Sequence, residues 1–160
     1  MEIKIKKGNT RNQLICIRPN GTVLKADLGP TLPFHDIAHF VVENNVGLSE
    51  GFYGNILKGY SVEQLSDKQV VKTLGLEALF SEIAARALQS LSYGACIMEQ
   101  FLGLIKDELH QFSANYHFNL TEERIIEMKI EYKRLLDEWR NLSEGEVLEL
   151  HFSVNRLAQI

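Results

Sequence analysis

The stretch VLELHFSV, residues 147–154, decides the fold class, because the first residues of the chain share its pattern of side chains. Apolar and polar residues alternate along it, which is the period of a half-buried β-strand. Ile3 and Ile5 alternate with charged residues in the same way. We therefore expect both ends of the chain to join one small antiparallel sheet, whose covered face carries Ile3, Ile5, Leu148, Leu150 and Phe152.

Two further short strands are expected next to the first one. Residues 13–18 and 22–26 are both rich in apolar residues, and Pro19-Asn20-Gly21 lies between them. Asn-Gly between two such runs is a strong hairpin signal, because both residues tolerate a positive φ. The sequence therefore predicts a β-hairpin here.

The middle of the chain has helical periodicity. Residues 76–112 keep apolar side chains at helical spacing, and Ser92-Tyr93-Gly94 is the place where this long helix is expected to kink or divide. A last helix is expected from Thr121, a good N-cap followed by two glutamates. The prediction for residues 1–160 is one α+β domain, with a small antiparallel sheet covered by a layer of helices.

Composition limits the classes of function. The 160 residues carry a formal net charge of -4, which argues against a general nucleic-acid-binding protein. No apolar run approaches the roughly 20 residues that span a bilayer. MEIKIKKGNT lacks the apolar segment of a signal peptide, and Cys16 and Cys96 form no disulfide framework or metal-type spacing. We expect a cytoplasmic protein without nucleic-acid or membrane partners.

The chemistry is concentrated in LPFHDIAHFVVENN, residues 32–45. Pro33 suits the first turn of a helix and Gly47 suits its end, so residues 33–46 are predicted to form one helix. His35 and His39 are four residues apart on it, and Cβ atoms at this spacing lie about 5–6 Å apart. Two imidazoles at that separation can hold one ion.

Carboxylates follow the histidine pair closely. The predicted metal ligands are His35 and His39 with one or more of Asp36, Glu43 and Glu50, and Asp36 is either a ligand or a group that orients a histidine. Glu43 or Glu50, whichever is not a ligand, is the candidate general base. Imidazole with carboxylate suits a divalent metal, most simply zinc, while iron and manganese remain open. The competing interpretation is that the histidines are ordinary helix residues with hydrogen-bond partners.

The segment LPFHDIAHFVVENNVGLSEGFYG resembles a group of small uncharacterised bacterial proteins with an L-P-F-H-D-x-x-H-x-V-V-E core. The spacing H-D-x-x-H with a later glutamate is also similar to the metal motif of the Coq4-type ubiquinone-biosynthesis proteins. The second resemblance implies that His35, Asp36, His39 and Glu50 are metal ligands.

The surroundings of the histidine helix leave several alternatives open. Residues 47–60 contain four glycines and three aromatic residues, which is typical of a loop packed by its own aromatics. The alternative is that they form a pocket wall over the histidines, with Phe52 or Tyr53 in contact with an imidazole. His110 or His117 is a further metal-ligand candidate, although a solvated helix end is the simpler interpretation for both.

Two functional hypotheses follow from these residues. The first is a metal-binding protein, in its catalytic form a metal-dependent hydrolase or lyase acting on a small molecule through the helix at 33–46. The alternative is a non-catalytic ligand-binding or protein-interaction module with structural histidines. In that case a homodimer is an option, through the small residues Ala84, Ala85 and Ala87 or the region of Gly94.

Overall fold

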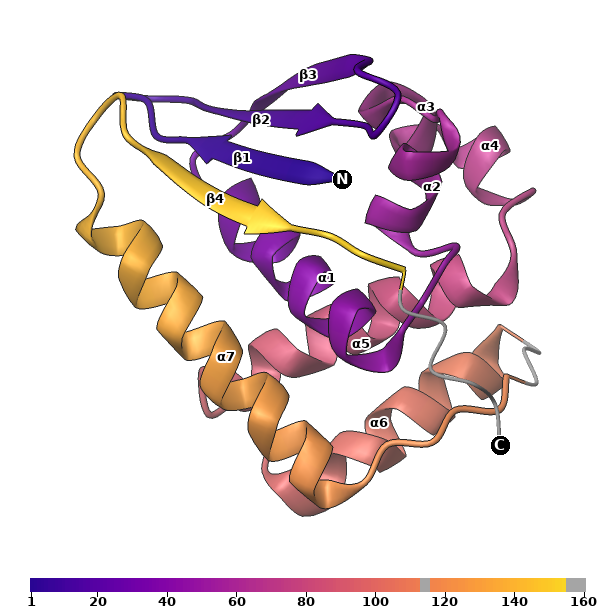
Figure 1. The fold of residues 1–160 in the computed structure, drawn as a ribbon. Helices are drawn as coiled ribbons and strands as arrows, with labels where there is room; N and C mark the ends of the chain where they lie inside the picture. The colour runs from indigo at the N-terminus through magenta and orange to yellow at the C-terminus, as the bar shows by residue number, and fades with distance from the viewer. Residues whose placement is uncertain (113–115, 155–160) are drawn as a thin grey trace.

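A computed structural model describes residues 1–112 and 116–154 (Figure 1). Four strands and seven helices occupy this part of the chain. They are, in order, β1 (Glu2–Lys6), β2 (Asn12–Ile17), β3 (Val23–Leu28), α1 (Leu32–Val46), α2 (Phe52–Lys58), α3 (Val62–Ser66), α4 (Lys68–Val71), α5 (Leu76–Ser92), α6 (Met98–Gln111), α7 (Glu122–Asn141) and β4 (Val147–His151). The α+β prediction is confirmed.

The sheet joins the two ends of the described chain. Its strand order is β3-β2-β1-β4 and every neighbouring pair is antiparallel. Ile3 lies opposite Leu150 and Ile5 opposite Leu148, so these side chains share one face. Ile3, Ile5, Leu148 and Phe152 are buried, and Leu150 is half-buried against the same core. The predicted covered face is therefore confirmed.

The β2–β3 hairpin turns where the sequence predicts. Gly21 has a φ of 82° and donates its backbone N–H to the Arg18 carbonyl. The Asn20 side chain accepts the backbone N–H of Thr22 at 3.0 Å, a local hydrogen bond that favours Asn in tight turns.

Helix α1 lies under the sheet and is the centre of the helical layer. Figure 1 shows α1 between the sheet and α5, with α7 running along one side, and α1 packs against both α5 and α7. Most of its residues are buried. In the described parts of the chain, no helix combines the length and hydropathy needed to cross a membrane.

The long helix is divided into α5 and α6 where a kink or division was expected, and Gly94, with a φ of 76°, lies in the break. The helices differ from the sequence prediction in two other places. Cys96, inside the range 76–112 that was predicted to be helical, lies in the connection between α5 and α6, so the prediction was wrong at this residue. The loop interpretation of residues 47–60 is wrong for 52–58, which form α2. Its glycines are required by packing: a Cβ at Gly51 would collide with the Glu43 carboxylate and one at Gly54 with the Ser49 backbone.

The turn between α7 and β4 gives a test of the fold. Gly145 has a φ of 88°, a conformation that costs an L-residue about 1–2 kcal/mol. Gly145→Ala is expected to lower the free energy of urea unfolding by that amount. Gly103 lies inside α6 with open space around its Cβ position, so Gly103→Ala is expected to raise it by about 0.5–1 kcal/mol. A change in the free energy of unfolding that has the same sign in both variants would contradict this interpretation of the two glycines.

Candidate metal centre

Helix α1 brings the two predicted histidines together with a carboxylate from α5. Nε2 of His35 and Nε2 of His39 are 3.1 Å apart. Oε2 of Glu82 lies 3.3 Å from the first nitrogen and 3.1 Å from the second. These three residues, here called the His–Glu cluster, form a group that can hold a metal ion.

The orientation of His39 is fixed by a chain of hydrogen bonds. Its Nδ1 is 2.9 Å from the Ser81 hydroxyl, and that hydroxyl donates to Oε1 of Glu43 at 2.7 Å. Because the Ser81 proton points to Glu43, the Ser81 oxygen accepts from His39, whose Nδ1 carries the hydrogen. The lone pair of a neutral His39 is then on Nε2, directed at the cluster.

The ring of His35 is also oriented by a hydrogen bond from its Nδ1, but to a different residue. Its Nδ1 lies 2.9 Å from Oε1 of Gln89. An amide oxygen only accepts, so Nδ1 of His35 donates and its Nε2 also presents a lone pair to the cluster. Gln89 lies two helical turns after Glu82, so one face of α5 provides both contacts to His35.

The electrostatics of the cluster favour a cation. Burial lowers the pKa of His39, but hydrogen bonds to Glu43 and Glu82 outweigh this effect and raise it to about 9. Interactions with the imidazoles of His35 and His39 hold the pKa of Glu82 well below its usual range. Without a metal, a proton on His39 therefore offsets part of the negative charge of the carboxylates.

The carboxylate of Glu43 contacts both the start of α2 and the residues that orient His39. Its carboxylate is fully buried and accepts the backbone N–H groups of Phe52, Tyr53 and Gly54 at 2.6, 2.9 and 3.2 Å, besides the Ser81 hydroxyl. Oε1 of Glu43 is also 3.3 Å from Nδ1 of His39. Glu43 thus connects the start of α2 to the His39 ring.

The other predicted site residues lie outside the His–Glu cluster. Glu50 is paired with Lys58 through a half-exposed carboxylate. Asp36 is buried, and its Oδ2 has no hydrogen-bond partner among the described residues. Burial raises the pKa of Asp36 to about 6, against the opposing effect of His39 and His35. His110 and His117 are exposed.

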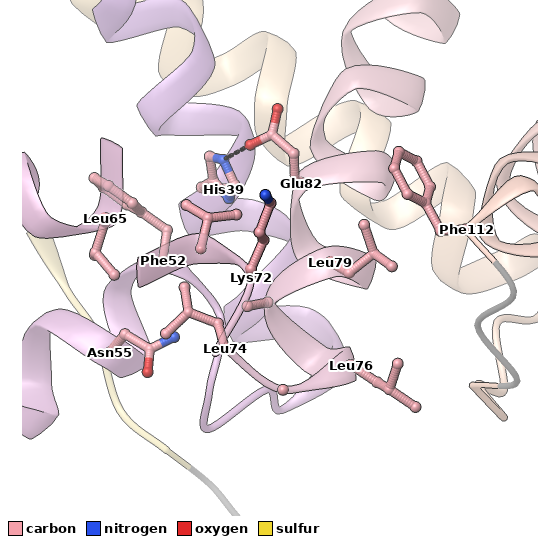
Figure 2. Close-up of a pocket in the computed structure, with 13 residues that line it drawn as sticks. His39, Phe52, Asn55, Leu65, Lys72, Leu74, Leu76, Leu79, Glu82 and Phe112 are labelled. Carbon is pink, nitrogen blue, oxygen red and sulfur yellow. Dashed lines mark hydrogen bonds and ion pairs between the residues drawn. The ribbon is translucent and has the colours of Figure 1, made fainter. Parts of the chain in front are cut away.

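A cavity of about 640 Å³ opens beside the cluster (Figure 2). His39 and Glu82 form part of its wall, and the remaining lining residues come mainly from α2 to α5. The Phe52 ring lies 5.2 Å from the His39 ring and lines the same cavity. The prediction that residues after the histidine helix form a pocket wall is confirmed at Phe52.

Sequence reasoning missed Glu82, together with Ser81 and Gln89, which support the two imidazoles. A weak signal exists, because Ser81 is polar but falls beside the apolar stripe of a helix that buries Phe80 and Ile83. Nothing in the α5 sequence shows that this face packs against α1. The His–Glu cluster depends on that tertiary contact.

Comparison of the chain with protein-family models, with curated proteins and with solved structures finds no match. The geometry of the site is therefore the basis for assigning a function.

The raised pKa of His39 predicts how the metal-free protein responds to pH. A folded pKa of about 9 exceeds the unfolded value of about 6.5, so the folded state holds this proton more tightly. Its contribution to stability is complete below pH 6.5 and is lost as pH rises through 9. In EDTA we expect the free energy of urea unfolding to fall by about 2 kcal/mol between pH 6.5 and 8.5. His39→Gln should remove most of this slope, and an unchanged slope would contradict the assignment.

Proposed function

We propose that the protein binds one divalent metal ion through Nε2 of His35, Nε2 of His39 and the carboxylate of Glu82. The separations of these atoms carry the proposal. Ligands about 2.0–2.1 Å from a tetrahedral zinc ion are about 3.3 Å from one another. The three separations in the His–Glu cluster are 3.1, 3.1 and 3.3 Å, so an ion fits with little movement of the side chains.

The surroundings of the ligands support the same assignment. Both Nδ1 atoms are engaged by Ser81 and Gln89, which leaves both Nε2 atoms for the ion. Histidine ligands of metals almost always make such a second hydrogen bond. The Glu43–Ser81–His39 chain is the corresponding carboxylate support, and in this proposal Glu43 is a positioning residue.

The position of the cavity supports a catalytic role. Three protein ligands leave coordination positions open, and the cavity contacts both His39 and Glu82. A metal with an open position supplies an acidified water or a Lewis acid. We therefore infer a metal-dependent hydrolase or lyase acting on a small molecule, with zinc as the first candidate and iron or manganese as the alternatives for this ligand set.

The alternative is a non-catalytic module in which the cluster is an ion pair between protonated His39 and Glu82, at 3.1 Å. A dimer through Ala84, Ala85 and Ala87 is not favoured, because these side chains are buried within the chain. The resemblance to the Coq4-type proteins implies Asp36 and Glu50 as ligands, whereas the carboxylate that contacts both imidazoles belongs to Glu82.

Elemental analysis of protein purified without an affinity tag tests the metal proposal. We expect about one equivalent of metal in the wild type, and none in a His35→Ala His39→Ala double variant that remains folded by circular dichroism. Metal-free wild-type protein that also fails to take up zinc, manganese or iron(II) at pH 8 would overturn the proposal and favour the ion-pair alternative.

A further inference from the structure

We propose that the cavity beside the His–Glu cluster binds a medium-length apolar carboxylic acid, with its tail along the cavity walls and its carboxylate at the end formed by His39, Glu82 and Lys72. This inference rests on the proposed function, because the bound metal supplies one of the two positive charges that meet the carboxylate. A volume of about 640 Å³ is within the range of cavities that enclose small organic ligands.

The walls of the cavity specify the apolar part of the ligand. Apart from Asn55 and the polar groups near the cluster, the lining is mainly aliphatic and aromatic, and it includes Phe52, Leu65, Val71, Leu74, Leu79 and Phe112. Figure 2 shows Leu65, Phe52 and Leu74 to one side of Lys72 and Leu79 and Phe112 to the other. A lining of this kind gains free energy by covering hydrocarbon and offers few hydrogen bonds to a sugar or nucleotide.

Several of these wall residues remain exposed to water. Val71, Leu76 and Phe112 are 47%, 45% and 59% exposed, and all three line the cavity. A group of large apolar side chains left in contact with water around one hollow marks a binding surface. An apolar tail would cover part of them.

The polar end of the cavity specifies the charge of the ligand. Lys72 is the only lysine or arginine among the described lining residues, and no ion pair joins it to another described residue. Figure 2 shows its side chain directed toward the end of the cavity that holds His39 and Glu82. Arg86 is engaged by Glu82 and Glu108, so Lys72 is the cation available to a ligand.

The charges at this end favour an anionic ligand. A divalent ion and Glu82 sum to one positive charge, and Lys72 adds another. A ligand carboxylate lowers this excess and can approach both the ion and the ammonium group, whereas an amine would be repelled. Charge complementarity therefore favours an acid over a neutral or basic ligand of the same length.

Calorimetric titration of zinc-loaded protein with decanoate, decylamine, 1-decanol and acetate tests the inference. We expect decanoate to bind at least about tenfold more tightly than each of the others, since a factor of ten corresponds to about 1.4 kcal/mol. Decylamine and decanol lack the anion, and acetate lacks the tail. Equal affinity for decanoate and decanol would overturn the choice of a carboxylate.

Charge and wall variants with matched controls test the two ends of the cavity. Lys72→Glu should weaken decanoate binding about tenfold, whereas Lys68→Glu, on the exposed side of α4, should not. Phe112→Ser should also weaken it, whereas Ile130→Ser, a similarly exposed residue outside the cavity lining, should not. If each cavity variant and its control changed the decanoate affinity equally, the assignment of the cavity as the binding site would be overturned.

Zinc uptake measured on the same samples separates this inference from the metal proposal. Zinc binding without decanoate binding would overturn the inference and leave the metal site intact. Decanoate binding that depends on Lys72 in protein that takes up no zinc would support the cavity as a carboxylate site and overturn the metal site. We expect decanoate binding that depends on both.

Discussion

Glu82→Gln is expected to weaken zinc binding by more than about 100-fold, because loss of a direct ligand exceeds the 10–100-fold cost of losing a supporting contact. The glutamine amide keeps the size of the side chain but removes its charge, and an amide oxygen is a poorer ligand for zinc. Glu82 is half-exposed, so the variant should fold. Zinc affinity is measured by competition with a chelator at pH 8.

Glu50→Gln is the matched control, since Glu50 is also half-exposed and is the ligand suggested by the sequence motif. It should retain zinc affinity within about threefold, as expected for a surface change that touches no ligand. The reverse result, with Glu50→Gln losing zinc and Glu82→Gln keeping it, would favour the motif-based ligand set over the His–Glu cluster.

Glu43→Ala is expected to lower the free energy of unfolding by about 3–5 kcal/mol, the cost of leaving buried partners of a charged group unpaired. The change removes the acceptor for three backbone N–H groups at the start of α2 and for the Ser81 hydroxyl. Urea unfolding of the metal-free protein at pH 7 gives the measurement.

Glu50→Ala provides the comparison for this second variant. Glu50 is half-exposed and paired with Lys58 on the surface, and such pairs contribute about 0–1 kcal/mol. A loss below about 1 kcal/mol in Glu43→Ala would show that Glu43 does not hold α2 against α1. That result would favour Glu43 as the general base that the sequence suggested.

The sheet and the histidine helix could be predicted because their signals are local. Alternation at Ile3 and Ile5 and again at Leu148 and Leu150 specifies two half-buried strands, and the structure pairs these residues directly. Pro33 and Gly47 mark the ends of α1 within one residue. The approach of His35 to His39 follows from helical geometry alone.

The rest of the site depends on contacts that no local pattern encodes. Glu82 lies 43 residues after His39, and the two meet only because α1 packs against α5. The helix α2 could not be predicted for a related reason. Gly51 and Gly54 suggest a loop, but these glycines are needed because they allow close approach to Glu43 and Ser49. A tertiary requirement here overrides helix propensity.

The position of the metal tests the central claim most directly. Crystals of the protein grown with zinc, with data collected on both sides of the zinc absorption edge, locate the ion by its anomalous scattering. We expect one peak about 2.0–2.1 Å from Nε2 of His35, Nε2 of His39 and a carboxylate oxygen of Glu82. A zinc peak at Asp36 or Glu50 without Glu82, or an ordered His–Glu cluster with no peak at saturating zinc, would contradict it.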